Sequence, residues 1–453
     1  MPGKISIRWK NPRILFVVLL AVSMITFAIF CRHKDLSPSG IIAITALFAS
    51  FIVLTFATGA QRKNILLLLC SVIFSLYIIE CTLHFFLTPK ERRVLDQVVR
   101  QTKIRPDTRT ALEFVADMVR DGNPAAPFIP PKSFTRIVGL SLFPLSALSR
   151  IQTVFCNDYG IWQTYLSDQH GFNNPVADYS VNANDAVIVG DSFVNGHCVP
   201  WGEDVGSFLR LGGVRCLNLG MAGNGPLIEL GVITEYAERL KPKTVFWCYF
   251  EGNDLNDLQD ELASNILPDY LNDDFSQNLM NRQQELDDLL REHVAAASKN
   301  PPETTTRPLT SILFLRNIRS RLGFSFFKDH SDALQNTFYS IIGKANTRVN
   351  SWGGQMVFVY LPTYQTIFDK STDATRALFL ERIRLQGITV IDMAQEFRQM
   401  DDPLEAFPFR LPGHYSSTGY RRLAEAFLHF LKKDKPVTRN FHRQDLGKRL
   451  CAK

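Results

Sequence analysis

The apolar residues of this chain are spread unevenly, and three long apolar runs lie within the first ninety residues. They cover residues 14–31, 40–60 and 65–87. Each run reaches or approaches the roughly 20 residues that an α-helix needs to cross a bilayer. No small-residue cleavage site follows the first run, which argues against a signal peptide. The pattern predicts three transmembrane helices in residues 1–87, with short loops at 32–39 and 61–64.

The basic residues around these runs predict the orientation in the membrane. Those before the first run, together with Arg62 and Lys63, favour the cytoplasmic side, whereas Arg92, Arg93 and neighbouring basic residues favour the opposite arrangement. Because the first helix usually dominates, we expect a multi-pass protein of the cytoplasmic (inner) membrane with a periplasmic or extracellular domain.

The third run also carries two ionisable residues, Glu80 and His84, one helical turn apart. Such residues in a membrane helix are functional candidates. The alternative is that they reach the membrane interface with no further role.

From about residue 151 the pattern changes to short apolar runs that alternate with longer amphipathic ones. The strand-like runs are 185–189, 214–219, 244–250, 355–361 and 388–391, and the helical runs are 226–240, 331–352, 374–386 and 418–432. This alternation predicts an α/β fold: a three-layer α/β/α domain with a mostly parallel, doubly wound, flavodoxin-like sheet.

The remaining segments lack this alternation. Residues 88–150 are mixed and Pro-rich near their end, and they are interpreted as a connector to a domain at 151–432. A polar insertion lies at about 255–327, with a helix expected at 273–298. It covers the site, binds a partner or forms a solvated surface excursion. The basic tail, 433–453, is expected to be disordered, and the alternative is contact with anionic lipid or polysaccharide. No segment resembles a nucleic-acid-binding module.

Composition adds little to this picture for a chain of 453 residues with a formal net charge of +6. Four of the eight cysteines, Cys156, Cys198, Cys216 and Cys248, lie in the large domain, where export would allow one or two disulfides. Cys216 and Cys248 fall in strand-like runs and are more typical of buried thiols. No cysteine–histidine motif indicates a metal, and no cofactor is expected.

Polar residues with catalytic potential follow three successive strands. The first strand ends in Gly190-Asp191-Ser192-Phe193, and a serine hydroxyl there becomes a nucleophile if a base lies nearby. The second strand ends in a glycine-rich turn that includes Gly223, and the third ends near Asn253; both can donate to an oxyanion. His414, before the last helix, can return a base to the same edge of the sheet.

With these blocks in this order, residues 151–431 resemble the SGNH (GDSL-like) hydrolase family. The resemblance implies Ser192 as nucleophile and His414 as general base. It also implies an oxyanion hole formed by the backbone N–H of Ser192 with Gly223 and Asn253. No GxSxG surrounds the serine, which argues against the nucleophile elbow of α/β-hydrolases.

The sequence departs from the family at the third member of the triad. The family usually has Asp three residues before the histidine, whereas this chain has Leu411. Three alternatives remain open: a Ser–His dyad, a carboxylate from elsewhere such as Asp168, Asp401 or Asp402, or an inactive site.

Two histidines outside the main blocks also bear on the site. Asp168-Gln169-His170, ahead of Ser192, resembles the motif of the polysaccharide-acetylating branch, in which Asp and His complete the triad. His197 is interpreted as structural.

The resemblance implies ester-bond chemistry through an acyl-enzyme. We expect a membrane-anchored esterase acting on acyl groups, O-acetyl above all, of envelope or extracellular glycans. The alternatives are an O-acyltransferase that works with a membrane-bound acyltransferase partner, and an inactive envelope assembly or glycan-binding protein with the same fold.

Overall fold

The computed structural model describes residues 58–86, 90–103, 105–175, 177–299, 312, 315–322 and 332–433, and these form parts of two units. The first unit comprises Met1–Arg93 and Pro302–Gln335. The second comprises Val94–Pro301 and Asn336–Lys453 and holds the parallel sheet.

The first unit contains α3 (Gly59–Phe86), which is long and apolar enough to cross a membrane. It is the one such helix among the described residues, and it corresponds to the third predicted span. Residues 1–57, with the first predicted span, the loop at 32–39 and nearly all of the second span, lie outside the described part. The prediction of a loop at 61–64 is wrong. The polar residues Gln61, Arg62 and Lys63 belong to the first turns of α3.

Glu80 of α3 is fully buried in this unit. Its carboxylate accepts hydrogen bonds of 2.9 Å from the backbone N–H groups of Asn317 and Ile318, in the first turn of α13 (Arg316–Leu322). A carboxylate at a helix N-terminus satisfies unpaired N–H groups and complements the helix dipole. Glu80 therefore fastens two helices of the same unit together.

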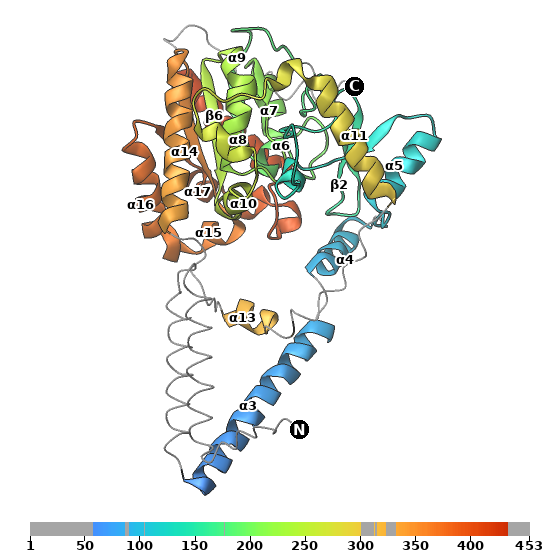
Figure 1. Ribbon diagram of the computed structural model, residues 1–453, viewed down its shortest axis with the longest axis vertical. Helices are drawn as coiled ribbons and strands as arrows, with labels where there is room; N and C mark the ends of the chain where they lie inside the picture. Colours follow the sequence, from blue (N-terminus) through green and yellow to red (C-terminus); the bar gives the residue numbers. More distant parts are fainter. Residues whose placement is uncertain are drawn as a thin grey trace, which may run out of the picture. The chain divides into compact units, whose positions relative to one another are not determined.

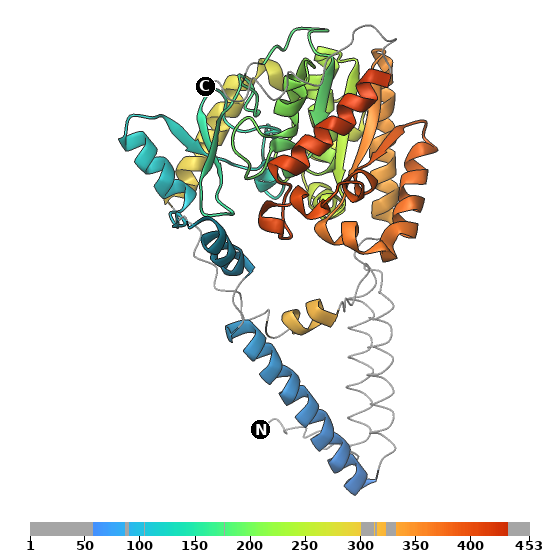
Figure 2. The same ribbon diagram turned by 180° about the vertical axis from the view of Figure 1, so that it is seen from behind.

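The second unit is built on a five-stranded parallel sheet of order β5-β4-β6-β7-β8 (Figures 1 and 2). Its strands are β4 (Ala186–Val189), β5 (Cys216–Asn218), β6 (Thr244–Phe250), β7 (Gln355–Leu361) and β8 (Thr389–Asp392). The predicted α/β class and the parallel, doubly wound strand order are confirmed. The order of the strands reverses at β4, and ligands of such sheets bind beyond the carboxyl end of the strands at this point.

Helices cover both faces of the sheet, as Figures 1 and 2 show with α8 (Pro226–Val232) and α14 (Asp332–Ser351) on one face and α18 (Ser417–Lys433) on the other. On the α18 side, Ile188 and Phe246 of the sheet share a buried cluster with Phe427. The rings of Phe246 and Phe427 stack with centroids 4.1 Å apart. Apolar side chains of the sheet thus pack against the covering helices, and this packing holds the strands in position.

A second, three-stranded sheet was not predicted. Its order is β1-β2-β3, formed by β1 (Ala125–Pro127), β2 (Gln152–Cys156) and β3 (Gln163–Leu166). β1 pairs parallel and β3 antiparallel with β2. The stretch 88–150 also forms α4 (Lys90–Thr102) and α5 (Ala111–Arg120). Most of the expected connector therefore lies inside the compact second unit.

The polar insertion is also structured in its described first part. Its predicted helix begins ten residues late, as α11 (Gln283–Lys299), because the preceding residues pack on the domain. Buried Glu235 accepts hydrogen bonds from the Gln277 and Leu279 backbone N–H groups and from Tyr270 Oη. Further described helical elements are α6 (Ser192–Asn195), α7 (Val205–Leu211), η2 (Ile233–Ala237), α9 (Glu238–Leu240), α10 (Asp254–Glu261), η3 (Leu267–Leu271), η4 (Leu279–Asn281), α15 (Tyr364–Phe368), η5 (Lys370–Thr372), α16 (Asp373–Arg384), α17 (Met393–Arg398), η1 (Pro131–Phe134), η6 (Pro403–Ala406) and η7 (Pro408–Arg410).

Candidate active site

Ser192 is the first residue of α6, directly after the tight turn that follows β4. A Cβ atom on Gly190 would lie 2.4 Å from Val194 Cγ2 and 3.0 Å from the Cys248 carbonyl oxygen, so only glycine fits. Asp191 caps α6, because its carboxylate accepts a 2.9 Å hydrogen bond from the Phe193 N–H. The turn thereby holds the Ser192 hydroxyl at the carboxyl edge of the sheet.

His414 reaches this hydroxyl from the loop that precedes α18. Its Nε2 lies 2.9 Å from Ser192 Oγ, a distance suited to proton transfer. The imidazole packs against the ring of Phe193, with centroids 4.7 Å apart, and the ring of His197, at 3.9 Å. The fold therefore brings the two predicted catalytic residues together.

The carboxylate that faces His414 belongs to Asp158, in the turn between β2 and β3. Asp158 Oδ2 lies 3.8 Å from His414 Nδ1 and 3.0 Å from His197 Nε2. The longer distance exceeds that of a direct hydrogen bond but still lets the carboxylate stabilise a protonated His414. Asp158 thus occupies the place, relative to the imidazole, of the third member of a triad.

A disulfide explains how Asp158 arrives there. Cys156, at the end of β2, is bonded to Cys198, next to His197. The bond ties the β2–β3 turn to the segment after α6. Sequence analysis named neither Asp158 nor this pairing. The pairing of Cys156 with Cys198 would have been the available signal in the sequence. Such a bond brings Asp158 close to the segment that follows Gly190-Asp191-Ser192.

Asp168, proposed as a third member, instead organises its own loop. Its buried carboxylate accepts hydrogen bonds from the backbone N–H groups of His170 and Phe172 and from the side chains of Asn174 and Tyr179. Burial raises the pKa of the Asp168 carboxyl. His170 turns toward Gln283 of α11, with a 2.9 Å contact at Nδ1, and burial lowers its pKa.

The other two proposed carboxylates also have different positions. Asp402 caps η6 by accepting a 3.1 Å hydrogen bond from the Leu404 N–H, and it pairs with Arg410, which lowers the pKa of the Asp402 carboxyl. Asp401 is exposed to solvent. Since Leu411 cannot orient the imidazole, Asp158 is the carboxylate that the fold supplies for this task.

The predicted oxyanion-hole residues are held by contacts around the nucleophile turn. The backbone of Gly223 has φ +84°, a left-handed conformation that favours glycine. Its turn is joined to the serine block by a hydrogen bond of 3.3 Å from the Ala222 N–H to Asn195 Oδ1. A further bond of 3.1 Å runs from the Met221 N–H to the Gly190 carbonyl.

Asn253, at the end of β6, is oriented by a second set of contacts. Its side-chain amide donates to Asp257, which also accepts a 2.7 Å hydrogen bond from Lys132 Nζ. A second N–H of the same amide can serve an oxyanion. Asn253 also lies close to Asp191, whose pKa burial raises. It is therefore placed beside the turn that carries Ser192.

Several carboxyl groups are buried beneath this edge. Burial raises the pKa of Asp191 to about 7, against the opposing effect of the Phe193 N–H. Burial also raises the pKa of Glu261 to about 8, although that group accepts hydrogen bonds from the N–H groups of Gly225 and Leu227. Carboxyl groups that hold their protons near neutral pH reduce the negative charge below the site.

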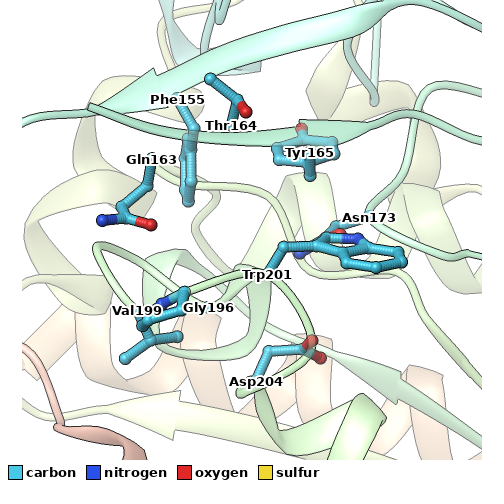
Figure 3. A pocket seen from close by; sticks show the side chains of 10 residues that line it. Phe155, Gln163, Thr164, Tyr165, Asn173, Gly196, Val199, Trp201 and Asp204 are labelled. Atoms are coloured by element: carbon cyan, nitrogen blue, oxygen red, sulfur yellow. The ribbon is translucent and has the colours of Figure 1, made fainter. Parts of the chain in front are cut away.

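A small pocket lies between the β2–β3 hairpin and the segment after α6 (Figure 3). Phe155, Tyr165 and Trp201 form much of its lining, with Gln163 adding an amide. The ring of Phe155 also contacts that of His197, with centroids 5.2 Å apart. Trp201, which also lines this pocket, is 57% exposed and offers an aromatic surface to solvent.

Comparison with known proteins shows a similarity of fold only. No family model matches the chain, and no curated protein matches it. A lipolytic protein of the G-D-S-L family from Desulfitobacterium hafniense DCB-2 is 16% identical, with 54% of this chain and 99% of that chain covered and a TM-score of 0.32. An acetylxylan esterase from Geobacillus stearothermophilus is 12% identical, with 56% and 95% covered and a TM-score of 0.32.

A two-domain esterase active on acetylated mannans is 12% identical, with 57% of this chain and 53% of that chain covered and a TM-score of 0.30. At such identities and scores the functional conclusions below depend on the geometry of the site.

Proposed function

We propose that this protein is an SGNH-type serine esterase. The observation that carries the proposal is the 2.9 Å contact between Ser192 Oγ and His414 Nε2 at the carboxyl edge of a parallel sheet. A base within hydrogen-bond distance of a serine in a tight turn is the arrangement that nucleophilic catalysis requires.

The reaction follows from the positions of these groups. His414 Nε2 takes the proton of Ser192 as Oγ attacks the acyl carbonyl. The backbone N–H groups of Ser192 and Gly223 and the Asn253 amide stabilise the oxyanion. His414 then returns the proton to the leaving alcohol, which leaves an acyl-enzyme. Water, deprotonated by His414, releases the acid and restores Ser192.

We further propose that the substrate is an O-acylated, above all O-acetylated, glycan at the cell envelope. The resemblance to polysaccharide-acetylating enzymes supports this proposal. The exposed Trp201 of the small pocket also supports it, since aromatic faces suit sugar rings. The apolar helix α3 supports anchoring in the cytoplasmic membrane. The Cys156–Cys198 disulfide supports an oxidising, extracytoplasmic location for the domain.

Labelling of the full-length chain in detergent with a fluorescent fluorophosphonate tests the nucleophile. We expect labelling of the wild type and loss of labelling in Ser192→Ala. An unlabelled but folded wild type would instead favour a non-catalytic assembly or glycan-binding role.

Product analysis then separates hydrolysis from transfer. An acetylated donor is incubated with the enzyme, with and without a glycan acceptor, and acetate and acetylated glycan are measured. We expect acetate in both cases. Acetylated glycan in place of acetate would favour the O-acyltransferase, acting with a membrane acyltransferase partner as acyl donor.

A further inference from the structure

Three potential metal ligands meet at the active site from separate parts of the chain. Asp158 comes from the β2–β3 turn, His197 from the segment after α6 and His414 from the loop before α18. One ligand atom from each lies within 4.8 Å of the other two. Two imidazoles with one carboxylate form a ligand set that divalent transition metals favour.

The distances fit a tetrahedral ion after small side-chain adjustments. Ligand atoms about 2.0–2.2 Å from zinc in a tetrahedron are about 3.4 Å from one another. Asp158 Oδ2 lies 3.0 Å from His197 Nε2 and 3.8 Å from His414 Nδ1, values on either side of that spacing. We propose that Asp158, His197 and His414 bind Zn²⁺, with water in the fourth position.

The three side chains are held in place and can be reached from solvent. The disulfide between Cys156 and Cys198 connects the segments that carry Asp158 and His197. The ring of Phe193 supports His414. The side chains of Asp158, His197 and His414 are 46%, 17% and 24% exposed, so an ion can enter without local unfolding.

Zinc at this site would stop turnover by fixing the tautomer of His414. A neutral imidazole that gives its Nδ1 lone pair to a metal carries its proton on Nε2. Nε2 then donates to Ser192 Oγ and can no longer take its proton. This consequence rests on the proposed esterase function, whereas the metal site itself does not.

Binding is measured on the full-length chain in detergent, with Ser192→Ala as the background so that no turnover occurs. Co²⁺ is followed by its visible absorption and Zn²⁺ by competition with a chromophoric indicator. Reductant is omitted, because free thiols of Cys156 and Cys198 would lie within ligand distance of His197. We expect one site with the strong absorption of tetrahedral Co²⁺.

Substitutions then assign the ligands. Loss of a residue that hydrogen-bonds to a metal ligand typically lowers metal affinity by about 10–100-fold. Loss of a ligand itself, in Asp158→Asn or His197→Gln, should therefore lower the affinity by at least about 100-fold. His429→Gln, at an exposed position of α18, is the matched control and should bind as the parent does. Unchanged affinity in both ligand variants, or no tetrahedral Co²⁺ spectrum in the parent, would overturn the proposal.

Activity of the wild type gives the second readout. Zn²⁺ should inhibit ester hydrolysis at the concentrations that fill the site, and His197→Gln should resist inhibition by at least about 100-fold. Activation by Zn²⁺ would contradict the tautomer argument. Metal binding by a chain without esterase activity would refute the proposed function while leaving the metal site supported.

Discussion

The two sheets contribute to the candidate active site in different ways. The five-stranded sheet presents Ser192 and Asn253 directly at the ends of neighbouring strands, β4 and β6. The three-stranded sheet presents Asp158 from a turn whose position depends on a disulfide. The nucleophile therefore follows from the topology of the main sheet, whereas the carboxylate depends on a covalent link between distant segments. Substitutions in each sheet can test this difference.

Replacement of the nucleophile should have the largest effect. Ser192→Ala should lower kcat for a chromogenic acetyl ester by at least about 10,000-fold, because no acyl-enzyme can form. The thermal unfolding midpoint should change little, since the hydroxyl is only partly buried. Ser371→Ala, at an exposed position, is the control. Comparable activity in Ser192→Ala would show that the chemistry occurs elsewhere.

Loss of the carboxylate from the small sheet should come next. Asp158→Asn should lower kcat by about 100-fold with little change in KM, because a protonated His414 loses its counter-charge in the transition state. This decrease in kcat is smaller than the one expected for a closely hydrogen-bonded triad, since Asp158 Oδ2 lies 3.8 Å from His414 Nδ1. Steady-state kinetics of this variant measure the effect.

The exposed Asp401→Asn provides the matched control and should retain wild-type rates. If Asp401→Asn were slow and Asp158→Asn fast, Asp401 would be the third member of the triad, and the small sheet would have no catalytic part.

The disulfide itself should matter for both stability and rate. The bond closes a loop of 42 residues. In the chain-entropy model such a loop corresponds to about 4 kcal/mol of folding free energy. Cys156→Ser with Cys198→Ser should therefore lower the unfolding free energy in urea. Its kcat should fall toward that of Asp158→Asn, because the carboxylate is no longer held near His414.

Wild-type kcat in a folded double variant would mean that packing alone positions Asp158. Cys216→Ser, which alters a buried thiol of the main sheet, serves as a control for general loss of stability.

The sequence predicted the main sheet well because its signals are local. The strands at 244–250 and 355–361 match β6 and β7 residue for residue, since in each a continuous apolar run follows a single polar residue. Ser192 and His414 were predicted as catalytic residues from a glycine turn at a strand end and a histidine before the last helix. Both patterns can be recognised within a few residues, and the structure places Ser192 Oγ and His414 Nε2 2.9 Å apart. The predicted helix after β5 is also present, although η2 interrupts it as a π-helix.

The small sheet and its carboxylate could not be predicted, because their signals are long-range. β1 has three residues of mixed burial, a pattern that does not differ from a loop. It becomes a strand only by pairing with β2. Asp158 acquires its role only when Cys156 and Cys198 are joined, and a sequence with several cysteines does not specify their pairing. The approach of Asp158, His197 and His414 to one another was missed for the same reason.

The two regions also differ in how deeply their carboxyl groups are buried. Asp191 of the main sheet is fully buried, and burial raises its pKa to about 7, whereas the Asp158 side chain is 46% exposed. The unfolded chain releases the Asp191 proton near pH 4 and the folded chain only near pH 7. The contribution of Asp191 to stability is therefore complete below about pH 4 and is lost as the pH rises toward 7.

Over this interval the wild-type unfolding free energy should fall by up to about 1 kcal/mol per pH unit on account of Asp191. Asp191→Asn keeps the acceptor for the Phe193 N–H but does not titrate, so its stability should vary less with pH. Thermal unfolding in detergent between pH 4.5 and 8 measures the two slopes. Equal slopes would show that other buried carboxyl groups, such as Glu261, dominate the pH dependence of the main-sheet edge.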